Sequence, residues 1–128
     1  MTLAARTSIR WIPTVLMAGL IVLSAVPDVF RAAGAITVFA HLGYPAYLLP
    51  FVGTAKMLGV AAVLAPGLQR IKEWAFAGLT FDLLGALYSH ASVGDAPPMW
   101  LPAAIGLALV VGSYAAYRSA SRHDEVDA

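Results

Sequence analysis

The sequence predicts an all-α integral membrane protein: a four-transmembrane-helix antiparallel bundle with a short outer interfacial helix between the first two spans. Three observations lead to this fold class. The chain of 128 residues is 60% hydrophobic and only 12% charged, whereas a soluble domain carries about 25% charged residues. Its mean hydropathy is +0.78. The charged residues are absent from long stretches, and each stretch approaches the roughly 20 residues that a helix needs to cross a bilayer.

Composition also excludes several other classes of protein. The chain contains no cysteine, which excludes disulfide frameworks, iron–sulfur clusters, zinc–thiolate sites and CxxC redox chemistry. A net charge of +1 leaves no basic patch that could neutralise phosphates, so nucleic acid is not an expected partner. The high apolar content argues against a disordered chain.

Four apolar stretches predict the membrane spans. The first and the last contain no charged residue, the second contains Lys56 and the third contains Asp82. Prolines, which lack an amide donor and interrupt helices, fall in each proposed connection, and they are Pro27, Pro45, Pro66, Pro97 and Pro98. The expected spans are residues 11–26, 47–65, 74–90 and 99–117. They form a single domain over residues 1–118, and we expect residues 119–128 to be a disordered, polar cytoplasmic tail.

The connection between the first two spans is long and contains an apolar segment of its own. Asp28 is positioned to cap a short helix at its start, and Gly43 to end it. Because the segment between these residues is too apolar for a free loop, we expect this helix to lie in the outer membrane interface or to fold over the mouth of the bundle.

The distribution of lysine and arginine predicts the orientation in the membrane. With four spans, both termini and the second connection share one side, and that side holds Arg6, Arg10, Arg70, Lys72, Arg118 and Arg122. The opposite side holds only Arg31. By the positive-inside rule both termini are cytoplasmic. A cleaved signal peptide at the N-terminus is the alternative, but the apolar run is long for one and Ser24–Ala25 matches a cleavage site poorly.

Lys56 and Asp82 lie at the midpoints of the second and third spans. At 1.5 Å per residue both are roughly 12–14 Å below the outer surface, on consecutive antiparallel helices. An unpaired charge at that depth costs about 3 kcal/mol, so the sequence predicts that the two side chains form an ion pair.

Small residues at helical spacing predict which face of each span points inward. The four stripes are Thr14, Ala18, Ile21 and Ala25; Gly53, Lys56 and Val60; Gly78, Asp82, Gly85 and Ser89; and Gly106, Val110, Ser113 and Tyr117. Because small residues let helices approach closely, we expect both charged side chains to face the bundle interior. Two interpretations stay open: a structural pair that fixes helix register, or a polar site that binds a ligand or exchanges protons.

The other ionisable residues carry weaker signals. Glu73 begins the third span, where a carboxylate favours the positive end of the helix dipole. His90 ends the same span and could be the outer port of a proton path from Asp82. His41 and Asp95 lie on the same side, but no spacing typical of metal ligands connects them, so no metal or haem site is predicted.

The central part of the chain resembles the DoxX-like family of small bacterial membrane proteins. The resemblance rests on HLGYP at residues 41–45, GTAKMLGVAAVLAP at residues 53–66 and IKEWAFAGLTFDLLGALYSH at residues 71–90. It covers roughly residues 11–117 and implies a four-helix fold in the inner (plasma) membrane with cytoplasmic termini. Lys56, Glu73, Asp82 and His90 fall on the motif positions and are the candidate functional or ligand-binding residues.

Three alternative functions stay open. The wider group is similar to subunits of a thiosulfate:quinone oxidoreductase, which favours a redox-linked membrane subunit that binds a quinone or another small lipophilic molecule near Lys56 and Asp82. Such a subunit has no redox centre of its own and needs a partner oxidoreductase. The second alternative is a non-catalytic interaction or assembly module. The third is a small proton-coupled carrier, which would need a homo-oligomer because four helices form a narrow bundle.

Overall fold

The computed structural model describes residues 2–127, apart from the side chains of residues 3–9 and 124. The described residues form five helices and no strand: α1 (Leu3–Val29), α2 (Ala33–Leu42), α3 (Leu48–Leu64), α4 (Gln69–Ser92) and α5 (Pro97–Asp127). The predicted spans coincide with α1, α3, α4 and α5, and the predicted short helix coincides with α2. The Arg6 side chain, used above for the orientation, and Ala128 lie outside the described part.

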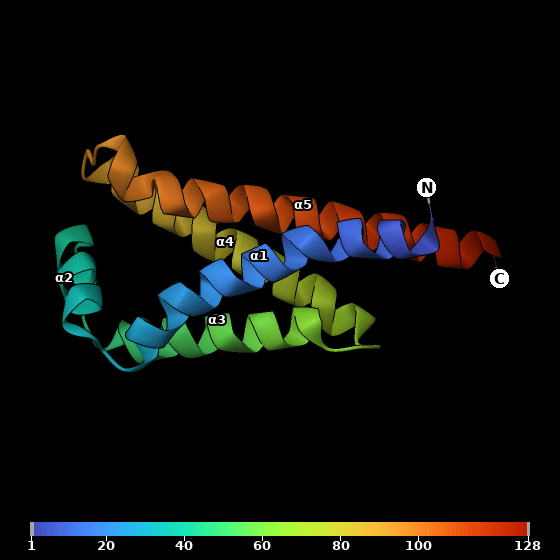
Figure 1. Cartoon of the computed structure of the whole chain (residues 1–128). Helices are drawn as coiled ribbons and strands as arrows, with labels where there is room; N and C mark the ends of the chain where they lie inside the picture. The colour runs from blue at the N-terminus through green and yellow to red at the C-terminus, as the bar shows by residue number, and fades with distance from the viewer. Residues whose placement is uncertain (1, 128) are drawn as a thin grey trace.

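The four long helices pack as a ring of neighbours. α1 contacts α3 and α5, and α4 contacts the same two helices. Figure 1 shows that both chain termini lie at the same end of the molecule. At the opposite end, α2 stands across the bundle. Short connections join α3 to α4 and α4 to α5, as expected for antiparallel neighbours.

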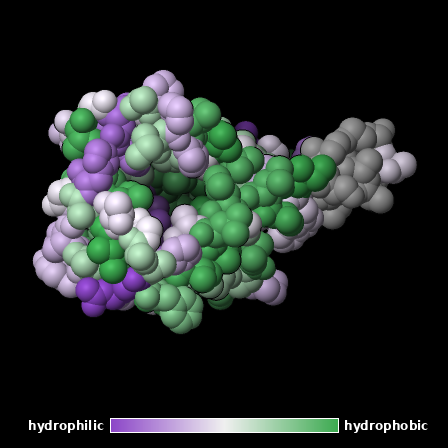
Figure 2. Space-filling view, turned by 60° about the vertical axis from the view of Figure 1, so that its left-hand side comes forward, coloured by the Kyte–Doolittle hydropathy of each residue, from purple (hydrophilic) through white to green (hydrophobic). Residues whose placement is uncertain are grey.

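Two helices are long and apolar enough to cross a membrane by length and composition alone. They are α1, over Arg10–Val29, and α5. Helices α2 and α3 are shorter apolar helices. Figure 2 shows hydrophobic residues covering the flank of the bundle and many of the polar residues gathered at the end nearest the viewer, where α2 lies. Membrane crossing by the four long helices therefore stays a prediction.

The core lies between the four long helices. Met17, Ile21, Val60, Leu79 and Val110 are among its buried residues. Leucines of α4 enter recesses at glycines of both neighbours: a Cβ added at Gly59 would lie 3.1 Å from Leu79, and one at Gly106 would lie 3.0 Å from Leu83. In addition, Thr14 Oγ1 and Ser113 Oγ share a buried hydrogen bond of 2.7 Å between α1 and α5.

Three of the predicted inward stripes are confirmed and one is wrong in part: Gly53 and Val60 of the α3 stripe are buried, and so is Ser89 of the α4 stripe. The stripe on α1, from Thr14 to Ala25, is buried, and so are Val110 and Ser113 on α5. On α4, however, Gly78 and Gly85 are exposed. The inward face of α4 is instead formed by apolar side chains such as Leu79 and Leu83, because these fill the recesses that glycines leave on α3 and α5. The small residues at these contacts thus lie on α3 and α5, and α4 contributes the larger side chains.

The expected cap at Asp28 is also wrong. Helix α1 continues through Pro27 to Val29, so Asp28 lies inside the helix. The helix ends in a Schellman motif at Arg31, which adopts a positive φ of 52°: Arg31 N–H donates to Asp28 O and Ala32 N–H to Pro27 O. These two bonds satisfy the last carbonyls of α1, so a proline so close to the helix end is tolerated.

The polar tail differs from expectation as well. Residues 119–127 continue α5 as helix instead of being disordered. Alanine and arginine, which favour helices, occur in this segment, and Ser121 Oγ donates to Tyr117 O one turn earlier.

The close approach of α3 to α1 at Gly53 gives a stability prediction. A Cβ added at Gly53 would lie 2.7 Å from Val29 N and 2.9 Å from Ala25 O, both backbone atoms of α1. We expect Gly53→Val to lower the free energy of unfolding by about 1–3 kcal/mol, because α1 and α3 must separate. Thermal unfolding in detergent micelles measures the loss. Gly85→Val is the matched control, because its Cβ meets nothing within 4 Å; equal losses would contradict the prediction.

Candidate functional site

The Lys56 side chain is held by α1. Its Nζ donates a 3.0 Å hydrogen bond to Asp28 Oδ2 and a longer one, of 3.5 Å, to Ser24 Oγ. The Lys56 and Asp28 side chains are only 15% and 10% exposed. Since Asp28 lies in the last turn of α1 and Lys56 in the middle of α3, this buried ion pair joins two helices that are neighbours in the ring.

Asp82 is the second acidic neighbour of Lys56, not the first. Its Oδ2 lies 3.9 Å from Lys56 Nζ, and its side chain is 29% exposed. The predicted proximity of Lys56 and Asp82 is therefore confirmed, but the hydrogen bond goes to Asp28. Within residues 2–127 no hydrogen bond reaches the Asp82 carboxylate, so its acceptor oxygens are open to a donor from outside the chain.

The sequence contained a signal for Asp28 that the cap interpretation missed. The buried stripe of α1 runs from Thr14 to Ala25 with alternating steps of four and three residues, and the next step of three leads to Asp28. A helix that continues through Pro27 therefore places the Asp28 side chain on the inward face. Asp82, in contrast, lies one residue before the inward-facing Leu83, and this offset leaves it at the edge of the interior.

A cavity of about 420 Å³ lies between these charged residues and α2. Its polar wall includes Asp28, Lys56, Asp82 and His90. The remaining lining is mostly apolar and comes from α1, α2, α4 and α5; on the α2 side it includes Gly34, Ala35, Val38, Phe39 and Leu42. A mostly apolar, concave space with a few converging polar groups is typical of a small-molecule site.

Asp95 bridges two histidines at the α2 end of the bundle. Its Oδ2 lies 2.6 Å from His90 Nδ1, and its Oδ1 lies 2.6 Å from His41 Nε2. The arrangement follows from the end of α4, where a Schellman motif at Gly94 makes Asp95 N–H donate to His90 O. This backbone turn places the Asp95 carboxylate beside the His90 ring, and α2 then brings His41 to its other oxygen.

The bridge fastens α2 over the cavity. Because an ionised carboxylate only accepts hydrogen bonds, His90 Nδ1 and His41 Nε2 each carry the hydrogen. These two bonds, first the one from His90 and then the one from His41, hold the pKa of Asp95 below its ordinary value of 3.8. A third bond, of 2.7 Å between Tyr44 Oη and Ser89 Oγ, holds the chain just after α2 against α4. These three contacts are together termed the α2 latch.

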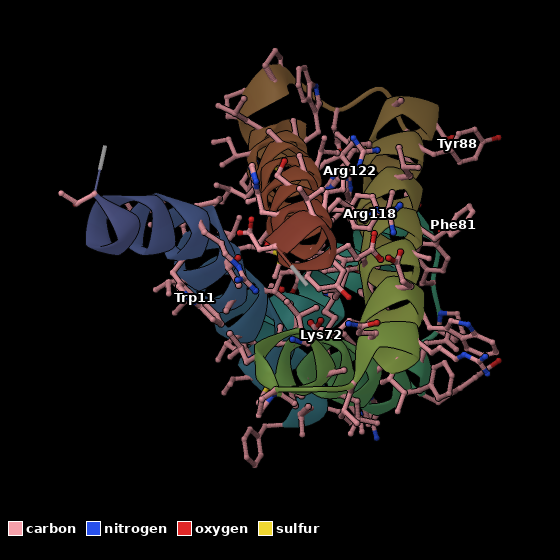
Figure 3. All side chains as sticks on the ribbon, turned by 90° about the vertical axis from the view of Figure 1, so that its right-hand side faces the viewer. Trp11, Lys72, Phe81, Tyr88, Arg118 and Arg122 are labelled. Carbon is pink, nitrogen blue, oxygen red and sulfur yellow. The ribbon has the colours of Figure 1, made fainter. Side chains whose placement is uncertain are left out.

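Glu73 lies apart from the cavity. Helix α4 begins at Gln69, so Glu73 is in its second turn, and the predicted interaction with the first-turn dipole is wrong. Its carboxylate instead lies 3.5 Å from Arg118 Nη1 of α5, in a half-exposed pair, and Figure 3 shows Arg118 on the helix facing α4. Such exposed pairs contribute little to stability.

The histidines and acidic residues do not form a metal centre in the described part of the chain. Among these residues, no three His, Asp or Glu side chains are arranged to hold a metal ion. His41 and His90 each meet a different oxygen of Asp95. The His41, His90 and Asp95 side chains are therefore hydrogen-bonded to one another.

Comparison with protein families identifies the chain. The model of the DoxX-like family matches residues 12–113, which include all of the residues that line the cavity. The chain belongs to the DoxX-like family. Comparison with curated proteins and with solved structures gave no significant match.

Family membership and the apolar helices together make this DoxX-like chain a membrane protein. The structure separates the residues at the motif positions into two groups. Lys56, Asp82 and His90 line one cavity, whereas Glu73 lies outside it. Sequence reasoning missed Asp28, His41 and Asp95 as parts of this region, because their contacts depend on how a helix end and a connection pack.

The unequal distances around Lys56 give a second prediction. We expect Asp28→Asn to lower the free energy of unfolding by about 3–5 kcal/mol, because it leaves the buried ammonium without its nearest opposite charge. Asp82→Asn should cost no more than about 1 kcal/mol, since that carboxylate is more exposed and 3.9 Å away. Chemical unfolding in mixed micelles compares the two variants, and a larger loss for Asp82→Asn would contradict this order.

The α2 latch gives a prediction about acidity. Because the pKa of Asp95 is lowered in the folded state, its carboxylate stabilises the α2 latch fully at pH values above 3.8. This contribution is lost as the pH falls through the lower pKa of the folded state. Hydrogen–deuterium exchange, corrected for intrinsic rates, should therefore show α2 protected at pH values above 3.8 and loosened only below it. In Asp95→Asn the protection should be reduced at pH values above 3.8, where the wild-type carboxylate stabilises the latch fully; unchanged protection there would show that the bridge does not hold α2.

Proposed function

We propose that this DoxX-like protein binds a small lipophilic molecule, with a quinone head group as the favoured ligand, in the cavity beneath α2. The observation that carries the proposal is the cavity of about 420 Å³, whose apolar walls surround a lysine ammonium and an open carboxylate. Its size falls in the range of roughly 300–1,000 Å³ of small-molecule sites. The Lys56 ammonium can donate to a quinone carbonyl, and the apolar walls suit the ring.

The proposed topology places this cavity within the outer half of the membrane. Helices α1, α3, α4 and α5 each cross the bilayer, with both termini in the cytoplasm of a bacterial inner membrane and α2 on the outer side. The basic residues near the chain termini and in the first turn of α4 support this orientation by the positive-inside rule. The residues of the α2 latch then face the outer aqueous side.

A redox role needs a partner. A bound quinone would supply the capacity to take up electrons and protons. The chain, which has no cysteine, would depend on a partner oxidoreductase to deliver electrons to that quinone. Protons have a polar route in the same region: Asp82 and His90 both line the cavity, and the His90 ring is linked through Asp95 to His41, whose side chain is 45% exposed.

A cavity-filling variant tests the proposal. Gly34 lines the cavity from α2, and a Cβ there meets nothing within 4 Å, so Gly34→Phe should fill the site without displacing its neighbours. We expect Gly34→Phe and Lys56→Met to weaken binding of tail-free dimethoxy-methyl-benzoquinone, measured by calorimetry on the purified chain, by at least about tenfold, or 1.4 kcal/mol. Gly19→Phe, on α1 and outside the cavity, is the control.

The second candidate function is an interaction or assembly module in which the charges are structural. The short Lys56–Asp28 bond favours it, because a closed pair between α1 and α3 stabilises the bundle with no ligand. In that case the benzoquinone does not bind the wild-type chain, and Gly34→Phe leaves the cellular phenotype unchanged while Lys56→Met lowers the thermal stability.

A further inference from the structure

A second hollow lies between α3 and α4 on the face that points away from the bundle interior. It has a volume of about 620 Å³, and apart from Lys56 and Asp82 its walls are apolar side chains and glycines. Its rim includes Phe51 of α3 and Phe81 of α4, which are 73% and 74% exposed. Figure 3 shows Phe81 projecting from α4 away from the other helices. This hollow is termed the α3–α4 groove.

The groove exists because α4 turns small residues outward. Gly78 lines it and is exposed, and a Cβ there would meet nothing within 4 Å. On the facing side, α3 contributes Ala55, Gly59 and Ala62. A pair of helices with such residues along one side leaves space that larger side chains would fill.

Lys56 and Asp82 are the two residues that line both the cavity and the groove. They therefore form the boundary between a space covered by α2 and a space open to the surroundings of the bundle. The Asp82 carboxylate at this boundary is 29% exposed and accepts no hydrogen bond from the described residues. A plain hydrocarbon chain lying against it would leave that acceptor unsatisfied, which is costly away from water.

We infer that the two hollows accept one ligand: a single-tailed amphiphile whose polar head lies at Lys56 and Asp82 in the cavity and whose hydrocarbon tail lies in the α3–α4 groove. This inference rests on the proposed function, which supplies the head-group site, and adds the chemical class of the rest of the molecule. In its reduced, quinol form the head donates a hydroxyl hydrogen to the open carboxylate, and the tail covers the exposed Phe51 and Phe81.

The test compares two quinone probes that share a head group, one with a decyl tail and one without. Binding of each is measured in the same nanodiscs for the wild-type chain and for two variants of the full chain. Gly78→Phe fills the groove, and Gly85→Phe, two turns along the same helix and outside the groove, is the matched control with equally free space for its Cβ. Because the probes partition equally into every sample, differences between variants report the groove.

We expect Gly78→Phe to weaken binding of the decyl quinone by about tenfold and to leave tail-free quinone binding unchanged, with Gly85→Phe like wild type for both. A decyl quinone with a terminal diazirine should label α3 and α4 at the groove, and excess unlabelled decyl quinone should prevent this. Equal binding of the decyl quinone by all three chains, or labelling spread over all lipid-facing helices, would overturn the inference while the head-group site stands. If the tail-free quinone does not bind the wild-type chain, the head-group site itself is wrong and the tail assignment fails with it.

Discussion

One buried ammonium governs the organisation of this protein. Lys56 sits in the middle of an apolar helix, where its charge needs a partner, and Asp28 provides it from the end of α1 at 3.0 Å. This requirement explains why α1 continues through Pro27 to Val29: a helix that ended at the proline would not carry the carboxylate into the bundle. It also explains the close approach of α3 to α1, since Gly53, one turn from Lys56, lies directly against the α1 backbone. Charge pairing and backbone packing thus act at the same contact.

Satisfying Lys56 through Asp28 has a consequence for Asp82. The carboxylate stays near the ammonium, at 3.9 Å, but accepts no hydrogen bond from it. A polar group with free acceptor oxygens therefore remains at the boundary between the cavity and the groove. The structure therefore combines a structural pair with an open acceptor, where the sequence suggested a choice between a structural and a functional pair. The α2 latch closes the other side of the cavity by a separate set of hydrogen bonds, which depend on the ends of α2 and α4.

What the sequence predicts well is what helical periodicity and charge burial determine. The apolar stretches located the four long helices, Gly43 ended α2 as expected, and equal depth along antiparallel helices brought Lys56 close to Asp82. The errors have physical causes. Proline ends most helices, but Pro27 is tolerated within the last turn of α1. The sequence therefore wrongly placed Asp28 outside that helix. A glycine in the sequence shows that the residue is small but not what it faces. Gly78 and Gly85 were therefore wrongly predicted to face the bundle interior.

The contacts that no periodicity encodes are those between connections. His41 and Asp95 are far apart in the sequence and meet only because α2 folds back over the bundle and a Schellman turn at Gly94 directs the carboxylate toward it. Residues in such positions can be recognised as polar and as lying on one side of the membrane. Their pairing depends on the length and path of two loops, which single-sequence reasoning does not determine.

The leucines of α4 also determine which parts of the molecule can change shape. Leu79 enters the recess at Gly59 on α3, and Leu83, one turn further, enters the recess at Gly106 on α5. A helix inserted into both neighbours at adjacent turns cannot slide along its axis or rotate without withdrawing both side chains. The three helices α3, α4 and α5 therefore behave as a rigid frame, and any adjustment to molecules of different size must come from rotation of the Phe51 and Phe81 side chains or from displacement of α2.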